Sequence, residues 1–391
     1  MKDLMKIIPA QMKTSSKMDS NDKILFLTLS LFSQTGGVQK VCKTMCKTLS
    51  DLVGNNIDLK VFSLCDNTKD MDERYIETRR FKGFDYNRLA FGLEAIKNGV
   101  ISTTVIISHV NLAPVALFIK LIRPKTNIIL IAHGIEVWRA IPFWKSLFMR
   151  RGMRIWSVSN FTMTQLMQKH GIDPLKVELL HNCLDPFFKV PTNFSKPEFL
   201  LKRYNLTDKQ PVLLVITRIT KNEQDKGYDQ IIKCFPMLLK EFPDLCYLLA
   251  GKCDKDEYLR LVQKLIKNNL QRQVKLIGFI AEEELTNHYL LADIFILTSK
   301  KEGFGIVLIE AAACGRKIIC GNQDGSSDAV LNGKIGEIID PDNSKQLQIT
   351  ISKILNSKND LQTFSKTQKT CIENFNYSQY KHKVEQLLNA Y

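Results

Sequence analysis

The stretch Glu302-Gly-Phe-Gly-Ile-Val-Leu-Ile-Glu310 sets two carboxylates eight positions apart across a glycine-rich turn. The apolar run at residues 293–298 comes before it and predicts a strand, and the apolar run at residues 306–314 predicts a helix. Gly303 and Gly305 let the backbone come close to a ligand. The new helix would point its free N–H groups and its positive dipole end at the same place. The pattern therefore predicts an anion site where a strand turns into a helix.

The two glutamates take different places at this junction. Glu302 stands at the mouth of the turn, and Glu310 falls one to two turns into the helix. Backbone amides hold negative charge and carboxylates accept hydrogen bonds from hydroxyl groups, so a ligand with an anionic part and a polyhydroxyl part suits the site. A nucleotide sugar has both parts. The alternative is an ordinary connection with two solvated glutamates.

Apolar runs alternate with amphipathic segments in both halves of the chain, which is typical of parallel α/β sheets. The expected strands are residues 24–32, 59–64, 105–108, 127–132 and 154–158 in the first half, and residues 212–217, 245–250, 274–277, 293–298 and 317–320 in the second. The expected helices include residues 38–54, 257–270, 282–292 and 377–390. Pro236 should kink or break the helix that begins after Tyr228.

The predicted fold is therefore α/β, with two Rossmann-like parallel-sheet domains. Residues 185–200 contain three prolines and lack periodicity, which indicates a connection between the domains. The expected organisation is a basic N-terminal tail at residues 1–22, an N-terminal domain at 23–187, a linker at 188–205, a C-terminal domain at 206–370 and a C-terminal helical segment at 371–391.

Charge and cysteine usage limit the possible partners and the compartment. The 391-residue chain carries 55 Lys and Arg against 40 Asp and Glu, a net charge of +15, which suits nucleic acid, an anionic membrane or an anionic substrate. Residues 137–172 contain several Lys and Arg with interleaved aromatic residues and no acidic residue.

The ten cysteines form no Cys-x-x-Cys pair and fall mostly within apolar runs, which is typical of reduced thiols in a cytoplasmic protein. The sequence predicts neither a secretory signal nor a membrane span.

The double-glutamate stretch resembles the Glu-x7-Glu motif of retaining GT-B glycosyltransferases, those of glycosyltransferase family 4 (the group 1 glycosyl transferases). Further segments resemble motifs of the same family in the same order, at residues 36–37, 132–138, 158–162, 182–185, 217–227 and 324–336. The resemblance covers roughly residues 23–345. It departs from the family at Cys183, where glycine is usual, and at Asp328, where glutamate is common.

The resemblance implies a GT-B fold, in which the two domains face each other across a cleft and the C-terminal one holds the nucleotide-sugar donor. It implies that Glu302 and His133 act at the donor sugar and that Glu310 binds the ribose. Arg218 and Lys226 would clamp the diphosphate, across a loop lengthened by an inserted Glu223-Gln-Asp. The remaining donor-binding residues are Gly36 and Gly37 against the phosphate, Gly303 in the turn, and Phe304 and Gly305 as backbone donors.

We expect neither a cofactor nor a metal ion. The chain holds three Asp-x-Asp motifs, at residues 70–72, 254–256 and 340–342, as used for metal binding by the GT-A glycosyltransferases. Three such motifs are close to chance in a chain with this many acidic residues. The cations Arg218 and Lys226 and the helix N-terminus would neutralise the leaving diphosphate instead.

The acceptor is expected to be a glycan or a lipid-linked glycan, and the function to be cell-envelope polysaccharide synthesis. After Pro142, residues Phe143, Trp144, Leu147 and Phe148 would form one helix face, which either packs on the N-terminal sheet or docks on an anionic membrane. Another GT-B enzyme, such as a sugar-nucleotide epimerase or a phosphorylase, is an alternative. So is a basic nucleic-acid-binding protein built around residues 137–172, although the sequence contains no recognised nucleic-acid module.

Overall fold

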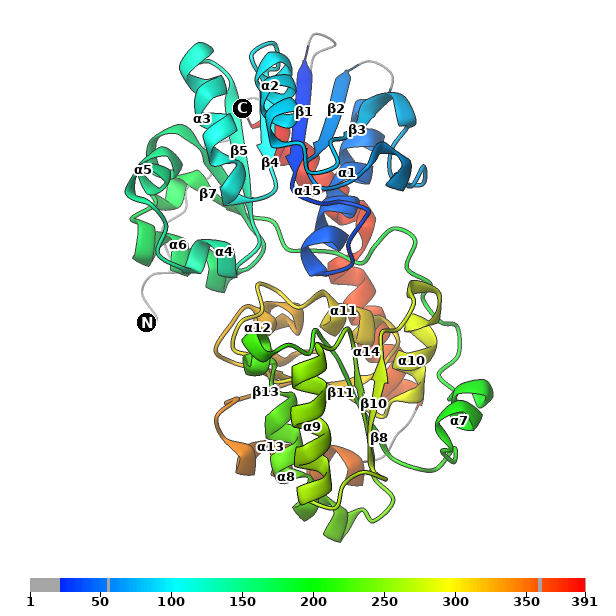
Figure 1. Cartoon of the computed structure of the whole chain (residues 1–391). Coiled ribbons are helices and arrows are strands. Elements are labelled where there is room, and N and C mark those ends of the chain that lie inside the picture. Colours follow the sequence, from blue (N-terminus) through cyan, green and yellow to red (C-terminus); the bar gives the residue numbers. More distant parts are fainter. Residues whose placement is uncertain (1–21, 55–56, 358–360, 391) are drawn as a thin grey trace.

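The computed structural model describes residues 22–54, 57–357 and 361–390. The predicted basic tail therefore lies, apart from its last residue, outside the described residues. The described chain forms two α/β lobes, one above the other in Figure 1.

The N-terminal domain is a seven-stranded sheet in the order β3-β2-β1-β4-β5-β6-β7, and every neighbouring pair is parallel. Its strands are β1 (Lys23–Thr28), β2 (Asp58–Ser63), β3 (Phe81–Gly83), β4 (Thr104–Ile107), β5 (Asn127–Ala132), β6 (Arg154–Ser157) and β7 (Val177–Leu179). Its helices are α1 (Gly37–Val53), α2 (Arg88–Gly99), α3 (Ala113–Ile122), α4 (Ile135–Trp138), α5 (Phe143–Gly152) and α6 (Asn160–His170).

The C-terminal domain is a six-stranded parallel sheet in the order β10-β9-β8-β11-β12-β13. Its strands are β8 (Val212–Ile216), β9 (Cys246–Ala250), β10 (Val274–Gly278), β11 (Ile294–Leu297), β12 (Lys317–Gly321) and β13 (Glu337–Ile339). The helices of this half are α7 (Glu198–Tyr204), α8 (Tyr228–Glu241), α9 (Lys255–Lys267), α10 (Leu285–Leu291), α11 (Ile306–Ala313), α12 (Ser326–Ala329), α13 (Ser344–Asn356), α14 (Leu361–Phe375) and α15 (Tyr377–Asn389). Two doubly wound parallel sheets confirm the predicted fold class.

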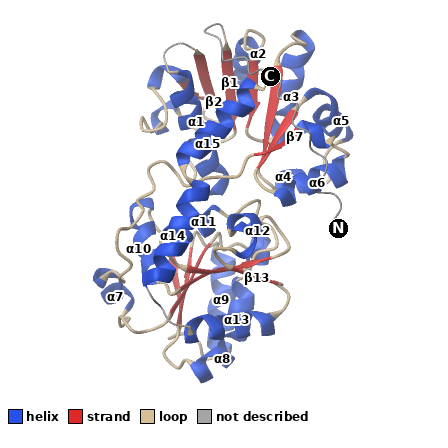
Figure 2. Cartoon of the chain, turned by 180° about the vertical axis from the view of Figure 1, so that it is seen from behind, coloured by secondary structure: helices blue, strands red, loops and turns tan. Residues whose placement is uncertain are grey.

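The last two helices connect the domains. Helix α14 packs on α11 in the C-terminal domain, and α15 then crosses back to pack on α1 (Figures 1 and 2). The Tyr377 hydroxyl donates to Asp51 at 2.8 Å, and Tyr380 and Val384 are buried in the same apolar cluster as Met45 of α1. One continuous apolar core therefore runs from the N-terminal sheet through α15 and α14 into the C-terminal domain.

The predicted strand at residues 24–32 is too long. Strand β1 ends at Thr28, because the following loop turns around the carboxylate of Asp66, which follows β2 and is fully buried. Asp66 accepts the backbone N–H groups of Leu31 and Phe32 at 2.6 and 3.1 Å, and that of Ser33 at 2.9 Å. These bonds replace the sheet bonds that a longer strand would have made.

Two further expectations about secondary structure need correction. Helix α8 continues through Pro236, because its apolar face, which includes Ile232 and Phe235, is buried against the sheet and holds the helix together across the missing hydrogen bond. The edge strands β3 and β7 were not predicted, because segments of three residues are too short to show a period of two.

Candidate active site

A cavity of about 530 Å³ lies between the two domains at the carboxyl ends of their strands. All ten residues proposed from the sequence line it: Gly36, Gly37, His133, Arg218, Lys226, Glu302, Gly303, Phe304, Gly305 and Glu310. The structure brings these residues together from positions up to 274 apart along the chain.

The position of the cavity follows from the strand orders. In each sheet the chain adds strands first toward one edge and then toward the other, so the strand order reverses once. The reversal lies between β1 and β4 in the N-terminal domain and between β8 and β11 in the C-terminal domain. Ligands of open α/β sheets bind outside the carboxyl ends of the strands at this reversal. The cavity is lined by the loops after β1 and β8 and by the turn after β11. The points at which the two strand orders reverse therefore face one another across the cavity.

Two helices begin at the cavity wall. Helix α1 starts beside Gly36 and Gly37, and α11 starts after Gly305, whose φ of 88° is in the left-handed region that glycine adopts without strain. The first N–H groups of a helix have no partner within the helix, and its dipole is positive at that end. Both domains therefore direct partial positive charge into the same space.

The turn at Glu302 is held by a buried aspartate. Asp324 accepts the Glu302 amide at 2.7 Å and the Ser326 amide at 3.0 Å. Burial and the nearby Glu302 carboxylate raise the pKa of Asp324 to about 7. Asp324 thus fixes the backbone from which the Glu302 side chain projects.

The same turn touches the N-terminal domain directly. A Cβ atom added to Gly303 would lie 1.6 Å from the backbone oxygen of His133, and one added to Gly134 would lie 2.8 Å from the Gly303 Cα atom. Only residues without side chains allow this contact. The two glycines therefore bring His133 of one domain and Glu302 of the other to the same end of the cavity.

Glu310 is buried in the first two turns of α11 and is held from two sides. The hydroxyl of Tyr289, from α10, donates to its Oε2 atom at 2.7 Å, and Lys40, from the first turn of α1, donates to its Oε1 atom. Burial and the neighbouring Glu310 carboxylate raise the pKa of Tyr289 well above its usual value, so Tyr289 stays a hydrogen-bond donor. The Lys40–Glu310 ion pair joins the two domains across the cleft.

The two cations of the predicted clamp also have carboxylate partners. Lys226 donates to Glu302 at 2.5 Å, and Arg218 pairs with Glu223 at 2.9 Å. Burial disfavours the charge on Lys226, but the Glu302 carboxylate outweighs this effect and raises the Lys226 pKa. Glu223 comes from the inserted part of the 3-10 turn η5 (Lys221–Lys226), so the insertion supplies an internal anion to the clamp.

His133 lies at the end of β5, on the opposite wall, and is buried. Burial lowers the pKa of His133 to about 3, so its imidazole is neutral. Neither ring nitrogen meets a hydrogen-bond partner among the described residues, although both are buried. The Glu136 carboxylate accepts the backbone N–H groups of His133 and Gly134 at 2.5 and 3.1 Å and holds the turn. A neutral imidazole without partners can donate to or accept from a ligand hydroxyl.

Several cavity residues were missed from the sequence. Lys40 lies one turn after Gly36-Gly37, and its position in the first turn of the predicted helix could have indicated that it faces the site. His109 lines the cavity, and it also caps the turn η3 (Val110–Leu112) by accepting the Asn111 amide at 3.0 Å. Tyr289 and Asp324 carried no local signal, because only the folded chain brings them to the two glutamates.

Two family-like motifs meet at the domain interface beside the cavity. Asp328, which departs from the usual glutamate, accepts the backbone N–H of Asn160 at 2.5 Å and its side-chain amide at 3.1 Å. The His181 ring also lies 3.5 Å from this carboxylate. The shorter side chain thus makes a contact between the two domains.

The aspartates of the three Asp-x-Asp motifs do not line the cavity. Within the ranges that the structure describes, no group of three or more His, Cys, Asp or Glu residues could hold a metal ion. Two of these aspartates have other partners: Asp72 pairs with Arg74, and Asp342 pairs with Lys300. In the same ranges, no helix is long and apolar enough to cross a membrane.

Comparison with known proteins identifies the class. Residues 198–376 match the family described as "Glycosyl transferases group 1". The chain is 28% identical over 242 residues to the GDP-mannose-dependent alpha-(1-6)-phosphatidylinositol monomannoside mannosyltransferase of Mycolicibacterium smegmatis, covering 58% of this chain and 61% of that one. It is 27% identical over 194 residues to the mannosylfructose-phosphate synthase of Agrobacterium fabrum, covering 48% and 42%. The matched part is less than two thirds of either relative.

Solved structures resemble the whole chain. The Anabaena protein HepE, solved in complex with UDP, superposes with a TM-score of 0.78 at 18% identity, covering 94% of this chain and 100% of that one. The sucrose-phosphate synthase of Thermosynechococcus elongatus superposes with a TM-score of 0.73 at 16% identity, covering 94% and 98%. The fold is thus that of GT-B glycosyltransferases, and residues 198–376 match the group 1 glycosyl transferases. The resemblance stated from the sequence is confirmed.

Proposed function

We propose that the protein transfers a sugar from a nucleotide-diphosphate sugar to a glycan or lipid-linked acceptor, with retention of the anomeric configuration. The observation that carries this proposal is the cavity at the two sheet reversals. Two clamp cations, two helix N-termini and a buried glutamate meet there. The named activity of the Mycolicibacterium smegmatis relative makes GDP-mannose the first donor to test.

The hard step in such a transfer is loss of the nucleoside diphosphate from the anomeric carbon. Arg218, Lys226 and the N-terminus of α11 would stabilise the charge that develops on the diphosphate. Each cation must first exchange its present carboxylate partner, Glu223 or Glu302, for a phosphate oxygen. Glu310 would accept hydrogen bonds from the ribose hydroxyls.

Retention follows if the acceptor enters on the face from which the diphosphate leaves. The bond from the anomeric carbon to the diphosphate oxygen then breaks, and a bond to the acceptor oxygen forms on the same face. The acceptor proton passes to the departing diphosphate, so no protein nucleophile is required. His133 would hold a sugar hydroxyl through its neutral imidazole, from the opposite wall.

A thermal-shift screen with GDP-, UDP- and ADP-sugars tests the donor assignment. A ligand at about 100 times its dissociation constant adds roughly 2.7 kcal/mol to the unfolding free energy. Absence of stabilisation by every nucleotide sugar would overturn the proposal. Release of the nucleoside diphosphate distinguishes a transferase from an epimerase, and turnover that requires inorganic phosphate would indicate a phosphorylase.

We also propose that the N-terminal domain docks on the inner face of an anionic cell membrane. The predicted apolar face of α5 is wrong in detail. Phe148 and Met149 are buried, whereas Phe143 is 74% exposed and Trp144 is 40% exposed, because the helix turns its first residues away from the sheet. The exposed pair lies beside Lys145 and Arg150, whose cations are 5.7 and 5.9 Å from the Trp144 and Phe143 rings.

Exposed apolar residues continue on the two neighbouring helices. Helices α2, α3 and α5 cover one face of the N-terminal sheet, so their outer sides share a surface. This outer apolar surface consists of Leu89, Leu93, Phe118, Leu121, Ile122, Phe143 and Trp144. Contiguous apolar residues beside cations are typical of surfaces that dock on anionic lipid.

Co-sedimentation with vesicles of phosphatidylglycerol and phosphatidylcholine tests the docking. The Leu121→Ser/Ile122→Ser variant should bind less, whereas Leu259→Ser, at an exposed site on α9 of the other domain, should bind like the wild type. A wild type that stays in the supernatant at low salt would contradict membrane docking and leave the transferase proposal standing.

A further inference from the structure

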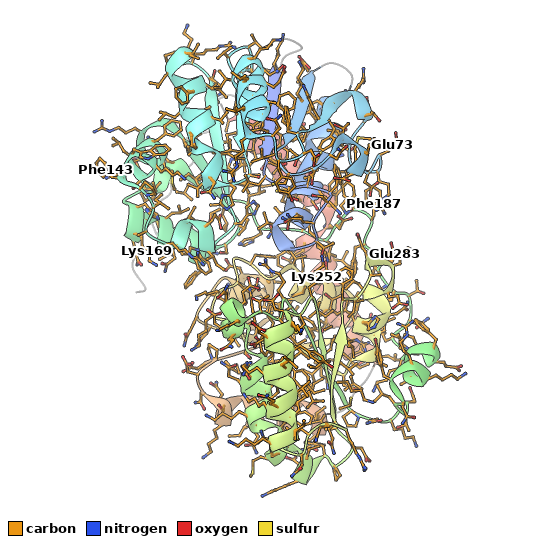
Figure 3. All side chains as sticks on the ribbon, in the orientation of Figure 1. Glu73, Phe143, Lys169, Phe187, Lys252 and Glu283 are labelled. Carbon is orange, nitrogen blue, oxygen red and sulfur yellow. The ribbon has the colours of Figure 1, made fainter. Side chains whose placement is uncertain are left out.

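A second groove, of about 700 Å³, lies on the N-terminal domain between the segment after α4, the helix α5 and the end of α6. Three cations from these three elements line it: Arg139, Arg150 and Lys169. The aromatic residues Trp138 and Phe143 form part of its wall. Figure 3 shows Phe143 at the left edge of this domain, Lys169 below it at the lower left, and Lys252 between the two domains.

The cations of this groove differ from those of the cleft. Lys40, Arg218 and Lys226 in the cleft each pair with a carboxylate. Among the described residues, no carboxylate forms an ion pair with a cation of the groove. The reason lies in the sequence, because residues 137–172 contain no acidic residue.

The individual contacts leave donor groups free. The Nε atom of Arg150 is buried and has no hydrogen-bond partner in the described structure, and its guanidinium lies 5.9 Å from the Phe143 ring centroid. Lys169 donates to the backbone oxygen of Trp138 at 2.8 Å, which uses one of its three N–H groups. A buried donor without a partner costs free energy, so a site that retains one is suited to a ligand that supplies an acceptor.

The groove and the cleft share a wall. Arg139, in the segment that follows α4, lines both. A ligand bound in the groove therefore lies next to the cavity that contains His133 and Glu302. An acceptor that spans the two would place one end among the three cations and a hydroxyl group near the donor sugar.

We propose that this groove binds a phosphate ester on the acceptor, held by Arg139, Arg150 and Lys169. Guanidinium groups match phosphate oxygens with paired N–H donors, and the ammonium of Lys169 adds a third point of contact. The phosphate is either part of a lipid headgroup, with Phe143 and Trp144 beside its apolar part, or part of a soluble sugar phosphate. The inference rests on the proposed transferase function, whose acceptor it describes.

Titration calorimetry with two probes tests the site. One is glycerol 3-phosphate, and the other is dihexanoyl phosphatidylglycerol below its micelle concentration. The wild type should bind at least one of them saturably. Binding of both shows that the phosphate suffices, and binding of the lipid alone shows that the headgroup is recognised together with its apolar part. Saturable binding of neither would overturn the proposal.

Arg150→Gln and Arg151→Gln form a matched pair, because both remove one charge from the end of α5 but only Arg150 lines the groove. Arg150→Gln should weaken probe binding about tenfold or more, as expected for charged hydrogen bonds, and Arg151→Gln should stay within about twofold of the wild type. Equal weakening by both variants would show that only general electrostatic attraction is at work, and the site would be rejected.

Arg139→Gln is the second test, because Arg139 is exposed and its replacement should not disturb folding. It should also weaken probe binding about tenfold; unchanged probe binding would contradict the assignment. Stabilisation of Arg150→Gln by the nucleotide sugar should equal that of the wild type. A variant that loses probe binding but still binds the nucleotide sugar has lost only the acceptor site. If the proposed function itself is wrong, no nucleotide sugar will bind to the wild type.

Discussion

The two walls of the cleft differ in the partners of the side chains that we propose to bind ligands. On the C-terminal wall, the side chains of Glu310, Lys226 and Arg218 all have ionic partners before any ligand is present. On the N-terminal wall, the buried ring of His133 has no partner, and Arg150 of the adjoining groove has a buried Nε atom without one. Unpaired buried groups typically cost about 1–3 kcal/mol.

The difference indicates two ways of binding. The ion pairs of the C-terminal wall are already formed, so under the proposed function a donor would exchange partners there, replacing carboxylate contacts with its own phosphate and hydroxyl groups. On the N-terminal side, His133 and Arg150 lack partners that a ligand can provide. The match to the group 1 family falls on the C-terminal half, at residues 198–376, the half to which we assign the donor.

The largest effect is expected at Glu310. Glu310→Ala should abolish measurable donor binding, because it removes the buried acceptor for ribose hydroxyls and leaves Tyr289 and Lys40 without their partner. Glu302→Gln should mainly lower turnover, because Glu302 lies at the mouth of the turn. Donor affinity and rate are measured for both, with the exposed Glu337→Ala as control. Full activity in either cavity variant would reject the site.

Loss of a clamp cation should have the next largest effect. Arg218→Ala and Lys226→Ala should each weaken binding of the nucleoside diphosphate by about 1.5–3 kcal/mol, as for hydrogen bonds to charged groups. Inhibition constants of the diphosphate measure this directly. Arg203→Ala is the control, because Arg203 pairs with Glu284 at the surface and does not line the cavity. Unchanged inhibition in both clamp variants would contradict the assignment.

Two histidines with lowered pKa values should make stability depend on pH. Burial lowers the pKa of His133 to about 3 and that of His109 to about 4, compared with about 6.5 in an unfolded chain. The unfolded state then holds more protons on these two histidines below pH 6.5, so their contribution to the unfolding free energy falls as the pH decreases, by at most about 1.4 kcal/mol per pH unit for each histidine. Asp324, whose pKa is raised to about 7, contributes in the opposite sense and is the same in the wild type and the variant. His133→Gln should reduce this slope in denaturant titrations between pH 4.5 and 6.5. An identical slope would show that His133 is protonated in the folded protein.

Removing the internal anion of the clamp should have a smaller and opposite effect. Glu223→Gln frees Arg218 from its carboxylate partner, so the nucleoside diphosphate should bind a few-fold more tightly, as expected when an exposed ion pair worth about 0.2–1 kcal/mol is lost. Product inhibition should become stronger to the same extent. Glu284→Gln, in a surface ion pair outside the cavity, should change neither quantity. Weaker binding in Glu223→Gln would mean that Glu223 orients Arg218 instead of competing with the ligand.

The smallest effect is expected from removal of divalent metal ions. Transfer should continue in EDTA, because the clamp cations and the N-terminus of α11 would neutralise the leaving diphosphate. The rate with EDTA is compared with the rate after Mg²⁺ or Mn²⁺ is added back. A loss of activity that only added metal restores would show that the donor needs a metal ion.

Much of the fold could be predicted, because its main strands are buried on both faces and appear as continuous apolar runs. Strands such as β5 and β9 were placed to within about a residue. Errors occurred where a distant residue overrides the local pattern, as Asp66 does at the end of β1. The residues of the candidate site could be predicted because they lie in short motifs. Within each motif, the residues proposed to act together are close in sequence.

The sequence by itself determined the α/β alternation, the two sheets and the strand–turn–helix junction that carries Glu302 and Glu310, since these depend on local periodicity and on spacing along one segment. Only the tertiary structure decided which groups meet. Lys40 reaches Glu310 across 270 positions, Gly303 contacts His133, and Arg139 joins the groove to the cleft. Such contacts depend on how two sheets and α15 pack together. Because no local pattern encodes that packing, the partners of each charged side chain could not be predicted from the sequence alone.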